Sequence, residues 1–144
     1  MKFSKATNYA LHTLVHLATV PKGKAIGVKP LAQLQGLSQA YLSKILATLV
    51  KGNLIESSPG VDGGYKLRKE ASEITFLQVI ELIEGRHTMF QCDVNHPTES
   101  ADCLIQQVMD GAEQKLKYYL TTKTIQDIAA KVEHDGEKHI TSRT

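Results

Sequence analysis

The sequence has few cysteines and no long run of apolar residues. Its two cysteines, Cys92 and Cys103, are too few for a disulfide-stapled scaffold. No apolar stretch approaches the roughly 20 residues that span a bilayer, and the first residues lack the apolar segment of a signal peptide. We therefore expect a cytoplasmic protein with no membrane partner, in which the cysteines are reactive, metal-ligating or simply packed.

Acidic residues are nearly absent from the first half of the chain. Residues 1–69 contain ten lysines and arginines but only two acids, Glu56 and Asp62. This half therefore carries a formal charge of +8, whereas the remainder carries −6 and the whole chain +2. Because affinity for phosphates depends on local positive charge, this asymmetry indicates an N-terminal part that binds a polyanion.

The rest of the composition is that of an ordinary globular protein. The chain has 144 residues, of which 42% are hydrophobic and 22% charged. These values exclude a disordered chain and predict one domain with its own core and appended segments.

Apolar spacing predicts three helices in the basic half. The first covers about residues 4–20, and the short second helix has Pro30 in its first turn and stops at Gly36. The third begins after a Ser38 cap and ends near Lys51. Its polar face contains no acid and is suited to an anionic partner; that face comprises Gln39, Ala40, Tyr41, Ser43, Lys44, Thr48 and Lys51.

A β-hairpin is predicted after the third helix. Residues 54–58 and 65–68 form its strands, and Lys66 and Arg68 share one face because side chains alternate along a strand. Gly63 and Gly64 suit a tight tip with positive φ or a close approach to phosphate. Three helices followed by a hairpin predict a mainly α, winged helix-turn-helix fold, whose third helix enters the major groove of double-stranded DNA while the hairpin contacts the backbone.

A long amphipathic helix is predicted to begin near Ser100. Its apolar stripe would be buried in a homodimer that places two recognition helices about one DNA turn apart on a palindromic operator. Packing within one chain, against the first helix, is the alternative. The stripe comprises Ala101, Leu104, Ile105, Val108, Ala112, Leu116 and Tyr119. After a break at 121–122, a last helix runs to about residue 133 and a polar tail follows.

Several stretches resemble the Rrf-type winged-helix transcription regulators, the family of IscR and NsrR. They are MKFS at 1–4, YAL at 9–11, LSQAYL at 37–42, LI at 54–55 and GGYKL at 63–67. The resemblance covers roughly residues 1–133 and implies a DNA-binding regulator, expected to be a repressor. It also implies a fourth helix opening at 74–75 and a cysteine-containing loop before a dimerisation helix. The bases would then lie nearest Gln39, Ala40, Tyr41, Ser43 and Lys44.

This reading divides the chain into four parts: a winged-helix domain (1–85), a sensor loop (86–100), dimerisation helices (101–133) and a tail (134–144). The wing departs from the family, whose members carry an arginine at its start. Here Ser58 and Pro59 occupy that place and Asp62 lies at the tip. We therefore expect Lys66 and Arg68 to hold phosphates instead of a side chain entering the minor groove.

The role of the cysteines remains open among four readings. Family members use three loop cysteines for an iron–sulfur cluster, so here a [2Fe–2S] cluster would need Cys92, Cys103 and another ligand such as His96. A redox or nitric oxide switch on the thiols is the second reading, because Cys103 lies near a helix start. Zinc or another metal is the third. If the cysteines are only packed, a small molecule or protein effector carries the signal.

Two other function classes were weighed. No Ser–His–Asp-like, Walker or Rossmann pattern is present, so we do not expect an enzyme. A winged-helix protein-interaction adaptor without sequence-specific DNA binding is the alternative to a DNA reader. Salt separates the two, because affinity for DNA falls with the logarithm of salt concentration at a slope of about −0.9 per phosphate contact.

Overall fold

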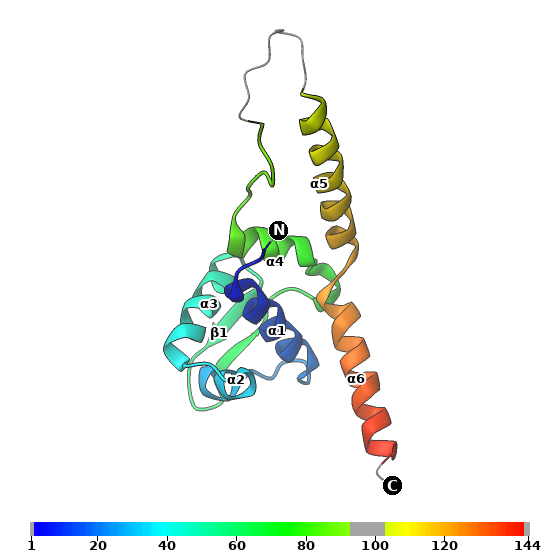
Figure 1. Cartoon of the computed structure of the whole chain (residues 1–144). Coiled ribbons are helices and arrows are strands. Elements are labelled where there is room, and N and C mark those ends of the chain that lie inside the picture. Colours follow the sequence, from blue (N-terminus) through cyan, green and yellow to red (C-terminus); the bar gives the residue numbers. More distant parts are fainter. Residues whose placement is uncertain (1, 93–102, 143–144) are drawn as a thin grey trace.

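The computed structural model describes residues 2–92 and 103–142 and is mainly helical with one antiparallel hairpin (Figure 1). The fold class predicted from the sequence is confirmed. None of the described helices combines the length and apolarity needed to cross a bilayer. In chain order the elements are α1 (Lys5–Thr19), α2 (Val28–Gln35), α3 (Gln39–Lys51), β1 (Ile55–Ser58), β2 (Gly64–Leu67), the 3-10 turn η1 (Ala71–Glu73), α4 (Phe76–Glu84), α5 (Leu104–Thr122) and α6 (Ile125–Ser142).

Local signals start and stop the first three helices as predicted. The side chain of Ser4 accepts a hydrogen bond from the Thr7 N–H, and Ser38 accepts one from the Tyr41 N–H. Gly36 ends α2 in the left-handed conformation at φ 66°. The apolar face of α3 is buried against α1 and α2, and each such side chain contributes roughly 1.5–3 kcal/mol; its members are Leu42, Ile45, Leu46 and Leu49.

The hairpin pairs Ile55 with Leu67 at its base and Ser58 with Gly64 near its tip. The other edge of β2 pairs with Ile26. The Ile26 N–H donates to the Tyr65 C=O at 2.9 Å, and the Tyr65 N–H donates to the Ile26 C=O at 2.8 Å. At Gly64 (φ 143°) a Cβ would collide with the Ile26 backbone. Glycine is therefore required at position 64 because the wing approaches the Ile26 backbone closely there, and this contact fixes the position of the wing.

The helices after the wing take two directions. A capping box between Thr75 and Gln78 starts α4, which packs against α1 and α3. Helix α6 lies along α1, whereas α5 packs on α4 and extends away from the body (Figure 1). Within one chain, α5 therefore packs on α4. The contact with the first helix that was predicted for the long helix is made by α6 instead.

Three predicted boundaries differ from the observed ones. Helix α5 begins at Leu104, later than the predicted start near Ser100, because Cys103 has non-helical backbone angles (φ −57°, ψ 120°). The last helix is capped by Thr124 and Asp127, which exchange hydrogen bonds of 2.8 and 3.2 Å, and not by residues 121–122. Helix α6 continues to Ser142, beyond the predicted start of a tail at 134, since helix propagation adds one hydrogen bond per residue once the helix is started.

Candidate nucleic-acid interface and cysteine pair

Helix α3 presents an exposed polar face on the side away from the core. All five residues predicted nearest the bases are exposed, as is Lys51 at the end of the helix; those five are Gln39, Ala40, Tyr41, Ser43 and Lys44. This face contains no acid, so nothing on α3 opposes an approaching phosphate. Its opposite side is packed in the core, which fixes the orientation of the exposed one.

An aromatic pair fixes the start of α3. The rings of Tyr9 and Tyr41 meet edge to face with centroids 5.9 Å apart, and Tyr41 stays 37% exposed. Tyr41 thus contacts α1 while its remaining surface faces outward. Tyr41 was predicted at the interface from its place on the third helix, whereas the role of Tyr9 was not, because no pattern along the chain indicates a contact between residues 32 positions apart.

The basic residues of the wing are held by neighbours. Lys66 lies opposite Glu56 in the hairpin register, and their charged groups are 3.6 Å apart. Arg68 donates a hydrogen bond of 3.1 Å to the Asn53 side chain, just after α3. Asn53 itself has a left-handed backbone (φ 62°) that turns the chain from α3 into the wing. Arg68 therefore ties the base of the wing to the end of α3.

A basic hollow adjoins the wing between β2 and the turn after α1. Its volume is about 330 Å³. Its only acidic lining residue is Glu70, which pairs with Lys22 at 3.1 Å. The cations around it are Lys22, Lys24, Lys66, Arg68 and Lys69. Much of the positive charge of the N-terminal half thus gathers in one place, where it raises the local concentration of an anionic partner.

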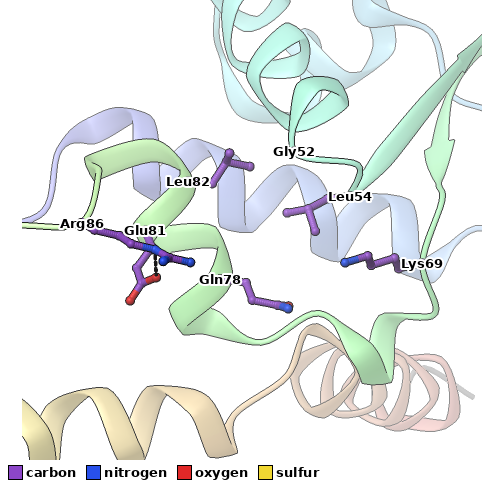
Figure 2. Close-up of a pocket in the computed structure, with 7 residues that line it drawn as sticks. All are labelled: Gly52, Leu54, Lys69, Gln78, Glu81, Leu82 and Arg86. Atoms are coloured by element: carbon purple, nitrogen blue, oxygen red, sulfur yellow. Dashed lines mark ion pairs between the residues drawn. The ribbon is translucent and has the colours of Figure 1, made fainter.

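Helix α4 meets the end of α3 at a groove of about 310 Å³ (Figure 2). The side chain of Leu82 reaches toward Gly52, and a Cβ at Gly52 would collide with it. Arg86 pairs with Glu81 at 3.0 Å on the far side of the groove. The contact between Leu82 and Gly52 links α4, which packs against α5, to the end of α3, which has the exposed polar face.

The two cysteines are close together at the start of α5. The Cys92 thiol donates a hydrogen bond to the Cys103 sulfur. The Cys103 side chain makes no capping hydrogen bond of ordinary geometry. The pKa of Cys103 is nevertheless lowered, because its thiolate is stabilised first by the Gln106 N–H and then by the Cys92 thiol and the Ile105 N–H. The predicted activation of Cys103 by a helix start therefore has a physical basis.

The described residues alone do not supply a complete set of ligands for an iron–sulfur cluster. Such a cluster takes four protein ligands, and no group of three His, Cys, Asp or Glu side chains that could hold a metal occurs within 2–92 and 103–133. The predicted ligand His96 lies outside the described residues, as do most of the predicted sensor loop and Ala101. Of the three predicted ligands, the structure describes Cys92 and Cys103, which form a pair of thiols in contact.

The predicted dimer stripe is largely exposed on α5. Leu104, Ile105 and Val108 are 77%, 65% and 71% exposed. Ala112 and Tyr119 are also exposed, while Leu116 turns toward α4 and lines a cavity of about 210 Å³ there. Tyr118, which the sequence analysis passed over, is 74% exposed. These side chains form an apolar surface larger than scattered single residues would give.

A helix-turn-helix followed by a hairpin beside its second helix is the arrangement of a winged-helix, DNA-binding transcription regulator. The profile described as "Rrf2: Iron-dependent Transcriptional regulator" matches residues 3–131. The chain belongs to the Rrf2 family, and the suspected resemblance is confirmed. This is a family of transcriptional regulators and not of enzymes.

Named relatives agree with this assignment. NsrR of Oceanobacillus iheyensis, an HTH-type transcriptional regulator, is 29% identical over 131 residues, which are 89% of this chain and 89% of that protein. CymR of B. subtilis, described as the global cysteine regulator, superposes with a TM-score of 0.72 at 27% identity, over 90% of this chain and 97% of CymR. IscR of T. potens has a TM-score of 0.76 at 23% identity over 94% and 90%, a likeness of fold alone.

Proposed function

We propose that the protein is a homodimeric repressor that binds a palindromic operator and responds to redox signals through Cys92 and Cys103. The observation that supports DNA reading is the exposed, acid-free face of α3, together with the basic hollow that adjoins the wing. Residues 1–85 read DNA, 86–100 receive the signal and 101–133 join two chains.

The exposed stripe of α5 supports a homodimer. A second copy would remove Leu104, Ile105 and Val108 from water at about 25 cal/mol per Å² of apolar surface. An isologous contact relates the two recognition helices by a two-fold axis, and this symmetry matches an inverted repeat in DNA.

The contact between the two thiols favours a redox response over a cluster or zinc. In the presence of a two-electron oxidant, Cys92 and Cys103 can form a disulfide with each other without any further protein ligand. A coupling of about 1–3 kcal/mol between the thiol state and DNA binding would change operator affinity 5- to 150-fold. Unchanged operator affinity after oxidation of the thiols would refute this part of the proposal.

The DNA-binding proposal is tested by selecting bound duplexes from a random-sequence pool. We expect an inverted repeat whose half-sites lie about 10–11 bp apart, or a multiple of that spacing. Affinity should fall with salt at a slope of about −0.9 per phosphate contact. Recovery of no common sequence together with a nearly flat salt dependence would support a protein-interaction adaptor instead. A reporter gene placed behind the selected repeat should be expressed more strongly when the regulator is removed.

A further inference from the structure

The segment that carries Cys92 is fastened to α5 by one side chain. The Gln106 amide oxygen accepts a hydrogen bond of 2.8 Å from the Cys92 N–H, and its nitrogen donates one of 3.0 Å to the Phe90 C=O. The same nitrogen donates a second hydrogen bond, of 2.8 Å, to Asp110 one turn further along α5. All of the amide's donors are thus used, and the plane of the amide is fixed.

A second attachment lies further along the same helix. Glu113 is 8% exposed, accepts a hydrogen bond of 3.4 Å from the Met89 N–H and forms an ion pair with the Lys117 ammonium at 3.3 Å. Residues 89–92 therefore lie along α5 and are held at two successive places. This attachment brings Cys92 to Cys103, eleven positions further in the sequence.

The geometry points to a two-thiol reaction with hydroperoxides, in which Cys103 attacks the peroxide, Cys92 closes an intramolecular disulfide and Gln106 positions Cys92. This inference rests on the proposed redox response of the same site and adds its oxidant, the order of its steps and a positioning residue.

The reaction balances with the peroxide as the only oxidant. With hydrogen peroxide, the Cys103 thiolate attacks one peroxide oxygen and the O–O bond breaks; the leaving hydroxide takes up the proton that the Cys103 thiol lost on ionisation and becomes water, and Cys103 is then a sulfenic acid. An alkyl hydroperoxide would release the corresponding alcohol in place of this water. The Cys92 sulfur next attacks the Cys103 sulfur, the S–O bond breaks, and hydroxide leaves with the Cys92 proton as a second water. The two thiols lose two electrons, which reduce the peroxide.

The division of roles follows from the surroundings of each sulfur. Cys103 is the residue before α5, and the N–H groups of Gln106 and Ile105 face its sulfur and stabilise negative charge there. Cys92 has its own backbone N–H committed to Gln106. Gln106 thus acts at both ends of the pair, through its N–H at Cys103 and its side chain at Cys92.

The test treats the full-length reduced protein with hydrogen peroxide and follows its mass, with dimedone present to trap sulfenic acid. We expect a loss of two hydrogens in the wild type and no shift to dimer mobility on a non-reducing gel. C92S should accumulate a dimedone adduct on Cys103. Q106M keeps the length of the side chain but removes the amide, so disulfide closure should slow about tenfold while peroxide attack at Cys103 is unchanged.

The ratio of trapped sulfenic acid to disulfide is the decisive readout, because a general loss of stability would not change it selectively. Q107M, at the exposed neighbouring position, is the matched control and should keep the wild-type ratio. A dimedone adduct on Cys92 in C103S at the wild-type rate, a disulfide between chains, or an unchanged ratio in Q106M would overturn the inference. If the disulfide forms as expected but operator affinity does not change, the proposed regulatory role fails while the thiol chemistry stands.

Discussion

Two serines begin the helices of the DNA-reading part, and both could be identified from the sequence. Ser4 and Ser38 act on N–H groups three residues ahead, so their role depends only on neighbouring positions. The contacts of Tyr9 with Tyr41 and of Arg68 with Asn53 join separate elements. No spacing rule reports such contacts, because they arise only when the helices and the wing have packed.

Gln39 is the residue at which base reading is best tested. It is exposed in the first turn of α3, and a glutamine amide can bond the N6 and N7 atoms of adenine together. We expect Gln39→Ala to weaken operator binding by about 1–3 kcal/mol and to relax the preference at one base pair. Binding to random duplex should change little. Titrations against the operator and its single-base variants measure this, with Gln107→Ala on α5 as the control; equal weakening on all duplexes would contradict a base contact.

Glu84 joins the N-terminus to the end of α4 and makes stability depend on pH. Hydrogen bonds of 2.6 Å from the Thr7 hydroxyl and the Ser4 N–H lower the pKa of Glu84 from its ordinary value. Because the pKa is lower in the folded state, this stabilisation is present above the unfolded pKa and is lost as the pH falls through the folded pKa.

Because water screens this partly exposed carboxylate, Glu84→Gln should lower the free energy of unfolding by less than about 1 kcal/mol at neutral pH. The difference from the wild type should shrink in acid, where the wild-type carboxylate is also neutral. Thermal unfolding at a series of pH values measures it. The exposed residue Glu133 provides the control Glu133→Gln, and a difference that stayed constant into acid would contradict the assignment.

At the scale of elements, the sequence placed the helices and the hairpin well but missed some of their ends. Periodicity located α1, α3 and the hairpin because their apolar residues repeat over several turns or strand positions. The start of α5 could not be located in this way, since the apolar stripe continues through Ala101 whereas the Cys103 backbone is not helical. The pairing of α5 with α4 and of α6 with α1 also depends on packing that no single element specifies.

The junction of α3 and α4 should be sensitive to one methyl group. Gly52→Ala would place a Cβ against Leu82, and overpacking of this kind costs about 1–3 kcal/mol. Leu82→Ala removes the obstructing side chain, so the double variant should be more stable than the sum of the single effects predicts. Urea unfolding of the four proteins measures this coupling, and strictly additive effects would show that the two residues do not collide.

At the scale of the whole molecule, charge asymmetry and the α5 stripe both appeared in the sequence. The sequence could not separate Leu116, which turns to α4, from its exposed neighbours, because both kinds of residue follow the same helical spacing. It also gave no sign of Gln106, a polar residue whose importance comes from the segment packed against it.

The homodimer can be tested at Val108. This residue is 71% exposed in the single chain, so Val108→Asp should leave the fold intact but bury a charge in the proposed dimer. We expect the dissociation constant of the dimer to rise at least about tenfold, which corresponds to about 1.4 kcal/mol, and operator binding to weaken with it. Analytical ultracentrifugation measures the dimer, Gln107→Asp is the control, and a variant that remains fully dimeric would place the interface elsewhere.

The attachment of α5 has a mechanical consequence. Its C-terminal end is fixed to the body, because Thr75 and Thr124 form a β-bridge and Ile125 and Phe76 donate backbone hydrogen bonds of 2.9 Å to Ile74 and Lys123. Its other end, with Cys103, stands away from the body (Figure 1). With 19 residues at about 1.5 Å each, the helix is about 28 Å long, and its C-terminal part packs on α4. A small tilt of α5 about this attachment would therefore displace the cysteine end further than the attached end, because displacement grows with distance from the fixed point.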